Sequence, residues 1–441
     1  MHIVLLSGGS GKRLWPLSND VRSKQFLKIF QNASGACESM VQRVWRQLHT
    51  ALPEAVFTVA APDAQRSVLQ NQLGSAMKIC AEPCRRDTFP AVVLAAAYLH
   101  DVRKADPGEA VVFCPVDTYA QDSYFAHLRA LHALAQSGAA NLVYMGTAPT
   151  YPSEKYGYIL PQTTEAVSAV RFFFEKPNAG DAAAYIRQGA LWNGGVFACR
   201  LGYLLERARE RFGTSDYTAL LGRYDTLEAC SFDYAVSEKE ASRLVLRYTG
   251  EWRDIGTWNT LTEVMDQPGI GEAVLDADCE NVHVLNEQPV PILCMGLKNV
   301  VVAASAQGIL VSDKGQSSRI KPLVEHIDRR VMFAEKSWGT FRVLDAGEGS
   351  LTAKLTLTAG CGLRYHSHRF RDEVWTVLSG TGRAVLDGVE RSVKPGDALS
   401  LPVGCRHTVF AETTLELIEV QTGSRIDAAD KCCDEWKNTS K

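Results

Sequence analysis

Residues Leu5–Lys28 read LLSGGSGKRLWPLSNDVRSKQFLK, and they begin inside an apolar run, His2–Leu6, that predicts a buried first strand. Glycine has no Cβ, so a glycine-rich turn lets backbone N–H groups approach a polyphosphate and form an anion nest. Arginine adds a fork of donors for phosphate oxygens, and lysine adds a point charge. We therefore expect a polyphosphate-binding loop formed by Ser7, Gly8, Gly9, Gly11, Lys12 and Arg13, with Lys24 as a further cation.

Two common phosphate-binding motifs do not match this turn. A P-loop, GxxxxGK[ST], requires Ser or Thr after its lysine, whereas Arg13 follows Lys12. A dinucleotide-binding turn, GxGxxG, requires a third glycine that is absent here. The simplest structural alternative is a glycine turn with two solvated cations, and the longer pattern described below argues against it.

The composition is that of an ordinary globular protein. The chain has 441 residues, of which 46% are hydrophobic and 22% charged, and this length predicts two or three domains. A net charge of −3 argues against nucleic-acid or anionic-membrane partners. No apolar run reaches the length of a membrane span, and the N-terminus lacks the features of a signal peptide. The twelve cysteines are scattered, so we expect free thiols in a cytoplasmic protein.

The order of strand and helix signals divides the chain into regions. Alternating signals through residue 262 predict an α/β, Rossmann-like domain over 1–265. Short β-rich pieces over 266–325 predict a β-solenoid-like linker, resembling a left-handed β-helix. Hairpin signals over 326–425 predict an all-β barrel, and the tail 426–441 shows no core pattern. Asp117 follows the predicted strand Ala110–Phe113 at its carboxyl end, where ligands bind in such sheets.

The N-terminal motif resembles the signature of sugar-1-phosphate nucleotidyltransferases. The resemblance covers Gly8–Ser18, GGSGKRLWPLS, and continues in Ser23–Leu27, SKQFL, which is similar to the mannose-1-phosphate guanylyltransferase branch. It implies transfer of GMP from GTP to mannose 1-phosphate, giving GDP-mannose and pyrophosphate. Such a transfer depends on positioning and charge neutralisation, with Mg²⁺ held by carboxylates near the triphosphate.

The resemblance also assigns catalytic roles. Asp117 lies in Pro115-Val116-Asp117, similar to the family's Pro-Ser-Asp-His, and Asp254 lies in a segment similar to Trp-x-Asp-Val-Gly-Ser-Trp. Both are expected to bind Mg²⁺, while Arg13 and Lys24 neutralise the phosphates. Thr118 replaces the family's histidine next to Asp117.

Further family motifs imply the base and sugar contacts. Glu82 lies in a segment similar to Glu-Pro-x-x-Arg-Asn-Thr, and a carboxylate at this position can accept from guanine N1–H and N2–H₂. Asp87 stands where the family has Asn, and Lys155 replaces a family glycine. The sugar phosphate is expected to contact Gly157, Glu175, Lys176 and Asn193, with Asp233 in either a structural or a functional role.

The C-terminal region resembles the cupin pattern. His366 and His368 lie on one face of a strand, because side chains alternate with a period of two, and Glu373 and His407 complete a four-ligand set. Three imidazoles and a carboxylate suit a divalent transition metal such as Zn²⁺ or Mn²⁺. The whole chain resembles bifunctional enzymes that also carry type II mannose-6-phosphate isomerase, although the segment between His368 and Glu373 is longer than the family's.

Several alternatives stay open. The transferase could use another sugar 1-phosphate or nucleotide, or it could be degraded beside a metal-dependent sugar-phosphate isomerase or epimerase. The chain could also be a sugar-nucleotide sensor, although sensing does not require cations for a leaving group. The cupin could serve another sugar-phosphate reaction, regulation or dimerisation, and we expect a homodimer.

Overall fold

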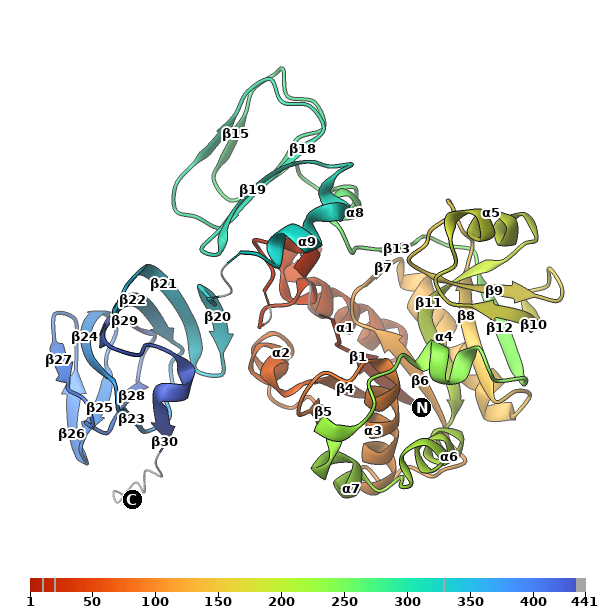
Figure 1. Cartoon of the computed structure of the whole chain (residues 1–441), viewed down its shortest axis with the longest axis horizontal. Helices are drawn as coiled ribbons and strands as arrows, with labels where there is room; N and C mark the ends of the chain where they lie inside the picture. The colour runs from red at the N-terminus through yellow and green to blue at the C-terminus, as the bar shows by residue number, and fades with distance from the viewer. Residues whose placement is uncertain (10–11, 20, 328–329, 434–441) are drawn as a thin grey trace. The chain divides into compact units, whose positions relative to one another are not determined.

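The computed structural model describes residues 1–9, 12–19, 21–327 and 330–433 (Figure 1). The chain forms two compact units: residues 1–14 with 23–267, and residues 15–22 with the chain from 268 onward. The first unit ends at residue 267, and the β-rich linker and the barrel fall together in the second unit, so the boundaries at 265 and 325 stay predictions. Part of the N-terminal signature also belongs to the second unit, where the Ser305 hydroxyl donates to the Pro16 carbonyl at 2.6 Å.

The first unit is built on a nine-stranded sheet with the order β5-β4-β1-β6-β11-β8-β12-β10-β9. Strands β5, β4, β1 and β6 are parallel, as the alternation of strand and helix signals predicts. Strand β11 runs antiparallel to β6 and β8, so the sheet is mixed rather than wholly parallel. The strands are β1 (His2–Leu6), β4 (Val56–Pro62), β5 (Ile79–Glu82), β6 (Ala110–Pro115), β8 (Leu142–Thr147), β9 (Gly157–Pro161), β10 (Val167–Phe174), β11 (Leu191–Arg200) and β12 (Arg243–Tyr248).

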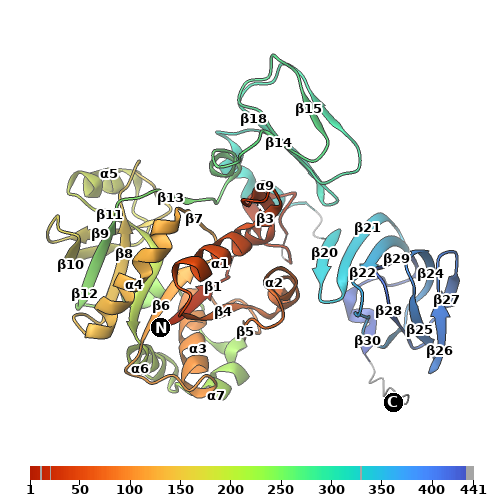
Figure 2. The same ribbon diagram turned by 180° about the vertical axis from the view of Figure 1, so that it is seen from behind.

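Helices pack against this sheet in two groups (Figures 1 and 2). Helix α3 packs on α6 and α7 and shares a core with Val4 and Phe113 of the sheet, whereas α1 packs on α4. The helices are α1 (Met40–Ala51), α2 (Arg66–Leu73), α3 (Thr88–Asp101), α4 (Asp122–Ser137), α5 (Ala179–Arg187), α6 (Leu201–Phe212), α7 (Tyr217–Gly222) and α8 (Trp258–Thr262).

Helix α3 begins at Thr88, and its cap is Asp87, whose carboxylate accepts from the Thr88 N–H at 2.7 Å. The Thr88 hydroxyl accepts from the Phe232 N–H at 2.8 Å. Asp87 has φ 66°, a left-handed value that Asn and Asp tolerate better than most residues.

The β-rich region of the second unit contains short parallel pairs. Strands β14, β16 and β18 pair in parallel, as do β15 and β17, and β19 pairs antiparallel with β18. Val282, Val284, Cys294 and Val302 form a small core between them. Such pairing is typical of stacked coils, and their handedness stays a prediction. The elements are β14 (Gly269–Ile270), β15 (Ala273–Leu275), β16 (His283–Asn286), β17 (Ile292–Cys294), β18 (Val300–Ser305), β19 (Gly308–Asp313) and α9 (Ile320–Val324).

The barrel consists of two sheets with the orders β20-β21-β22-β29-β24-β27 and β26-β25-β28-β23-β30. Alternate residues of strands such as β22 face an apolar core that includes Trp375 and Leu417. The strands are β20 (Phe333–Lys336), β21 (Gly339–Gly347), β22 (Ser350–Leu357), β23 (His366–His368), β24 (Arg371–Ser379), β25 (Gly382–Leu386), β26 (Val389–Val393), β27 (Ala398–Leu401), β28 (His407–Ala411), β29 (Leu415–Gly423) and β30 (Lys431–Cys433).

The barrel extends beyond the expected boundary at 425. Strand β30 pairs antiparallel with β23, and Asp430 is buried. The region that shows no core pattern in the sequence therefore contributes a strand to the sheet that carries His366, His368 and His407. The twelve cysteines are free thiols. None of the helices in the described ranges combines the length and apolar character needed to cross a bilayer.

Candidate functional site

The glycine-rich turn follows β1 at the edge where β6 also ends. Leu6 pairs with Pro115 in the parallel ladder, so the turn after β1 and the Asp117 segment emerge together. Gly9 has φ 111°, a conformation that residues with a side chain rarely adopt. Ser10 and Gly11 lie outside the described residues, and so does the side chain of Lys12.

Ser7 lies behind the turn rather than at its open side. Its hydroxyl is buried, donates to Gln65 at 3.1 Å and accepts from Gln25 at 3.2 Å. Gln65 also donates to the Ser23 hydroxyl, which donates to the Gly9 carbonyl at 2.9 Å. This network ties the turn to the Ser-Lys-Gln segment of the signature, which explains why the two sequence pieces occur together.

Two aspartates that are far apart in sequence meet at Lys24. The Lys24 Nζ lies 2.7 Å from Asp117 Oδ2 and 3.4 Å from Asp254 Oδ1. The convergence follows from a short antiparallel ladder, in which β13 (Trp252–Asp254) pairs with β7 (Thr118–Ala120) and Asp254 stands opposite Thr118. Burial disfavours the Lys24 ammonium, but the two carboxylates more than offset this and raise its pKa.

Arg13 approaches the same group of charges. A Cβ placed on Gly256 would lie 3.1 Å from Asp254 Oδ2 and 3.4 Å from Arg13 Nη2, so a glycine at this position leaves room for both side chains. Arg13 also lines a cavity of about 560 Å³ together with Asp117, which joins the charge cluster to the cavity. The remaining lining includes Gly8, Gly9, Pro62, Glu82, Arg85, Arg86, Asp87, Lys176, Asn193, Phe232 and Asp233.

Glu82 forms one end of the cavity. It is buried, and the Tyr224 hydroxyl donates to its Oε2 at 2.6 Å. Burial raises the pKa of Glu82, while the hydrogen bond from Tyr224 and the charge of Arg85 act in the opposite direction. Tyr224 is a partner that the sequence patterns did not indicate, because it lies in a short turn without a motif.

Lys176, Asn193 and Asp233 form the other end. The Asn193 amide donates to Asp233 Oδ1 at 3.3 Å, and the Ser237 hydroxyl donates to the same oxygen at 2.9 Å. Burial, followed by the nearby Glu175, raises the pKa of Asp233 from 3.8 to about 7, against the charge of Lys176. The sequence predicted either a structural or a functional role for Asp233, and in the structure this residue lines the cavity.

Glu175 and Gly157 are adjacent at this end. The Lys176 ammonium is paired with the Glu175 carboxylate. A Cβ on Gly157 would lie 2.7 Å from Glu175 Oε2, so only glycine leaves the carboxylate in this position. The four residues expected on the sugar side therefore lie together, and two of them line the cavity.

The four candidate ligands of the barrel also lie together. Their ligand atoms are all within 4.8 Å of one another, and His366, His368, Glu373 and His407 are all buried. His366 Nδ1 lies 2.7 Å from the Arg364 carbonyl and His407 Nδ1 lies 3.0 Å from the Cys405 carbonyl. Because a carbonyl only accepts, both Nδ1 atoms carry the proton and both Nε2 lone pairs are free for a ligand.

The donor chemistry of this cluster fits a metal ion. His407 Nε2 lies 3.4 Å from Glu373 Oε2, and within the described ranges it is buried without a hydrogen-bond partner. In the tautomer set by Cys405, both of these atoms are acceptors, so a cation between them would satisfy each. Arg371 lies beside the cluster, with Nε 2.9 Å from Glu373 Oε1 and Nη2 3.1 Å from His368 Nε2.

Comparison with known proteins matches both regions. A family model described as Nucleotidyl transferase matches residues 2–268, and one described as Mannose-6-phosphate isomerase C-terminal matches residues 325–433. Xanthan biosynthesis protein XanB from Xanthomonas campestris pv. campestris (strain B100) is 30% identical, covering 97% of this chain and 96% of that protein. Mannose-1-phosphate guanylyltransferase ManC from Salmonella typhimurium is 29% identical, covering 98% and 96%.

A solved structure is also similar. It is the crystal structure of a Thermus thermophilus protein described as a mannose-1-phosphate geranyltransferase, with a TM-score of 0.64 and 29% sequence identity. The match covers 74% of this chain and 98% of that one.

Proposed function

We propose, from the premise that this chain belongs to the nucleotidyl transferase family, that it transfers GMP from GTP to mannose 1-phosphate and releases pyrophosphate. The similarity to ManC over nearly the full length of both chains supports this substrate pair. The observation that carries the proposal is the meeting of Lys24 with Asp117 and Asp254 beside the cavity. Sensing of a nucleotide would not need cations placed for a leaving group.

In this mechanism the chain positions two anions and neutralises their charge. A phosphate oxygen of the sugar phosphate attacks the α-phosphorus of GTP, the bond from the α-phosphorus to the bridging oxygen breaks, and pyrophosphate leaves with the electron pair. Arg13 and Lys24 bind the triphosphate and the leaving pyrophosphate, with Lys12 assisting. The backbone N–H groups of Gly8, Gly9 and Gly11 donate to phosphate oxygens. Ser7 supports the turn from its buried side.

Asp117 and Asp254 would hold Mg²⁺. Two carboxylates with partly exposed oxygens suit an ion that takes few protein ligands and keeps phosphate oxygens and water in its other positions. When bound, Mg²⁺ supplies further neutralisation of the triphosphate.

Glu82 recognises the guanine base of GTP. Its carboxylate accepts from guanine N1–H and N2–H₂ while Tyr224 donates to one of its oxygens. The hydrogen bond from Tyr224 favours the ionised form that can accept, against the effect of burial. Bases without two adjacent donors are therefore disfavoured.

Replacing Tyr224 with phenylalanine is expected to raise the KM for GTP about tenfold, because Glu82 loses a hydrogen bond to its charged form. Steady-state kinetics at saturating mannose 1-phosphate measure this change. Tyr203→Phe is the matched control, since its hydroxyl donates to Glu240 at 2.7 Å and Tyr203 does not line the cavity. Equal KM values for the two variants would contradict the role of Tyr224.

Lys176, Glu175 and Asn193 bind the sugar phosphate, with Gly157 leaving room for Glu175. The lysine contacts the phosphate as a point charge, and the carboxylate and amide bind sugar hydroxyls. Asp233 completes this end through its contact with Asn193. The preference for mannose over other sugars rests on these hydroxyl contacts.

Asp233 is expected to make stability depend on pH. Its folded-state pKa of about 7 lies above the ordinary 3.8, so the folded protein holds the proton more tightly and loses stability as pH rises from about 4 through 7. Asp233→Asn removes this loss, so the variant gains melting temperature relative to the wild type between pH 5 and pH 8. Differential scanning calorimetry at both pH values measures it, and a difference that is independent of pH would overturn the assignment.

A screen of pyrophosphate release over nucleotide and sugar 1-phosphate pairs tests the proposed reaction. GTP with mannose 1-phosphate is expected to give the highest kcat/KM by at least about tenfold, in line with the discrimination a buried polar base contact supplies. A higher value for another pair would replace the substrate assignment while keeping the reaction class.

The cupin supports a second candidate activity, mannose-6-phosphate isomerase. The buried three-histidine, one-carboxylate cluster favours it, because a divalent ion such as Zn²⁺ or Mn²⁺ would polarise a carbonyl or hydroxyl of the sugar. His366, His368, Glu373 and His407 would hold this ion. Formation of fructose 6-phosphate from mannose 6-phosphate, lost in His366→Ala, tests it. A cytoplasmic location and a homodimeric state complete the proposal.

A further inference from the structure

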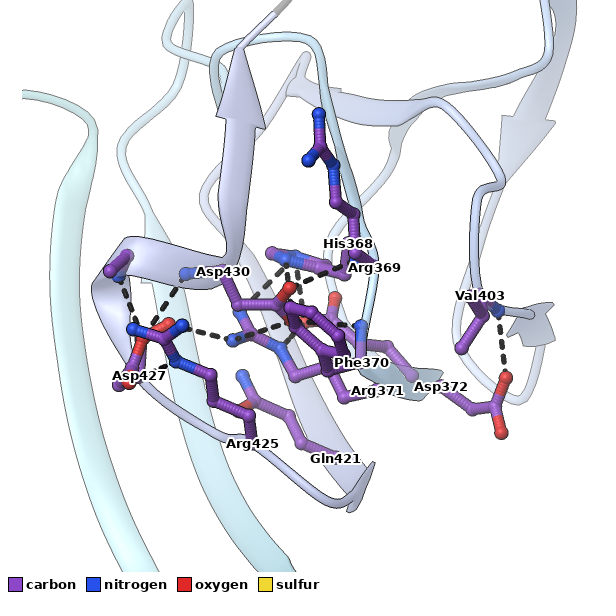
Figure 3. Close-up of polar contacts among 12 residues, drawn as sticks. His368, Arg369, Phe370, Arg371, Asp372, Val403, Gln421, Arg425, Asp427 and Asp430 are labelled. Atoms are coloured by element: carbon purple, nitrogen blue, oxygen red, sulfur yellow. Dashed lines mark hydrogen bonds and ion pairs between the residues drawn. The ribbon is translucent and has the colours of Figure 1, made fainter.

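Arg371 is a buried cation beside the metal-ligand cluster of the barrel. Its side chain is 8% exposed, and its guanidinium donates through Nε to Glu373 Oε1 at 2.9 Å and through Nη2 to His368 Nε2 at 3.1 Å. Its third group, Nη1, donates to the Asp427 carbonyl at 2.9 Å and lies 3.7 Å from Asp430 Oδ2. Figure 3 shows this fork reaching from the side of His368 to the segment that carries Asp427 and Asp430.

The guanidinium contacts two of the candidate ligand atoms of the cluster. His368 Nε2 and Glu373 Oε1 are 3.0 Å apart; Oε1 accepts from Arg371 Nε, and in the tautomer protonated on Nδ1 the His368 Nε2 accepts from Arg371 Nη2. A lone pair that accepts a proton donor is not available to a metal ion. Among the described residues, no cation is hydrogen-bonded to His407 Nε2 or Glu373 Oε2 in the other half of the cluster, and His407 Nε2 is left without a partner.

We propose that Arg371 is a built-in competitor of the metal ion for the cupin cluster. The guanidinium neutralises Glu373 in the metal-free protein and must withdraw from Glu373 and His368 before a divalent ion can use all four ligands. A guanidinium and a divalent ion repel each other strongly in a buried site, so occupation of these atoms by one weakens binding of the other. The inference rests on the proposed metal binding of the cupin and is independent of GMP transfer.

The fold provides a place for the withdrawn side chain. The Asp427 carbonyl and the Asp430 carboxylate already contact Nη1, and Asp430 is itself held by the backbone N–H groups of Arg369 and Phe370. Arg371 can therefore keep its contacts with this C-terminal segment while it releases the cluster. By binding the withdrawn side chain of Arg371, Asp427 and Asp430 thus affect the affinity of the cluster for a metal ion, although neither is a ligand.

Cobalt titration of the full-length, metal-free chain tests the proposal. Co²⁺ is the probe, because its visible absorption reports imidazole ligation, and His407→Ala supplies the background from Co²⁺ bound at other carboxylates. Arg371→Gln is expected to bind Co²⁺ at least about tenfold more tightly than the wild type. Arg369→Gln is the matched control, since Arg369 is exposed and next to the same cluster, and it should bind as the wild type does.

Thermal unfolding provides a second readout. Metal-free Arg371→Gln should melt at a lower temperature than the wild type, because Glu373 loses its cation, and Co²⁺ should restore more of its melting temperature than it adds to the wild type. If Arg371→Gln does not fold, Arg371→Lys keeps a charge but loses the fork and should bind Co²⁺ with intermediate affinity. Equal affinities in wild type and variant would overturn the competition alone, whereas no cobalt binding at His407 in either protein would overturn both the competition and the metal site.

Discussion

Lys24→Ala is expected to lower the kcat for GDP-mannose formation by about a thousandfold, the scale observed when a preorganised charge is removed from a phosphoryl-transfer site. Lys24 is the one contact shared by Asp117 and Asp254 within the described residues, at 2.7 and 3.4 Å. Its ammonium is held charged by these carboxylates, and it lies where the pyrophosphate gains negative charge. Steady-state pyrophosphate release at saturating substrates measures the loss.

Lys28→Ala is the control for this variant, because Lys28 is an exposed lysine four residues away on β2 (Lys28–Gln31). It should retain wild-type turnover. Removing Lys24 also leaves two carboxylates facing each other, so a lower melting temperature of the Lys24→Ala variant is expected and should be measured separately. A folded Lys24→Ala protein with turnover within about tenfold of the wild type would exclude Lys24 from the mechanism.

Asp254→Asn is expected to lower kcat by a similar factor, about a hundredfold to a thousandfold. The amide keeps the size of the side chain but loses the charge that supports Lys24 and that would bind Mg²⁺. Because the amide oxygen is a weaker ligand, the Mg²⁺ concentration that gives half-maximal rate should also rise. Initial rates measured over a Mg²⁺ series separate this effect from a change in the GTP KM.

Asp266→Asn serves as the control, since Asp266 is exposed near the end of the same unit. Its rate and Mg²⁺ dependence should match those of the wild type. If Asp254→Asn kept both the rate and the Mg²⁺ dependence, Asp254 would be a structural partner of Lys24 only.

The position of Asp117 could be predicted from the sequence, while its meeting with Asp254 could not be derived from the chain alone. Asp117 follows an apolar strand, and parallel strands end at a common edge, which places it beside the glycine turn. Asp254 reaches the same place only through the short pairing of β13 with β7. Ladders of three residues between distant segments leave no periodic signal, so the family motif was the only guide.

The residues that the sequence did not identify act through contacts with identified ones. Tyr224 contacts Glu82 across 142 positions, from a turn without a recognisable pattern. Arg371 was visible as part of a longer segment between His368 and Glu373, yet its inward direction follows from strand β24, where Arg371, Glu373 and Trp375 alternate with exposed residues. The alternation could be seen in the sequence. A cation pointing toward the histidines was nevertheless not expected, because the cupin motif predicts a metal ion there. Strand β30 was missed because its three residues are too few to show a periodic pattern.

Tracing label from GTP tests guanylyl transfer at this site. With mannose 1-phosphate, Mg²⁺ and GTP labelled at the α-phosphorus, the label should appear in GDP-mannose, and with GTP labelled at the γ-phosphorus it should appear in pyrophosphate. Label in free GMP or GDP instead, or incorporation that persists unchanged in the Asp117→Asn protein, would contradict guanylyl transfer at this site.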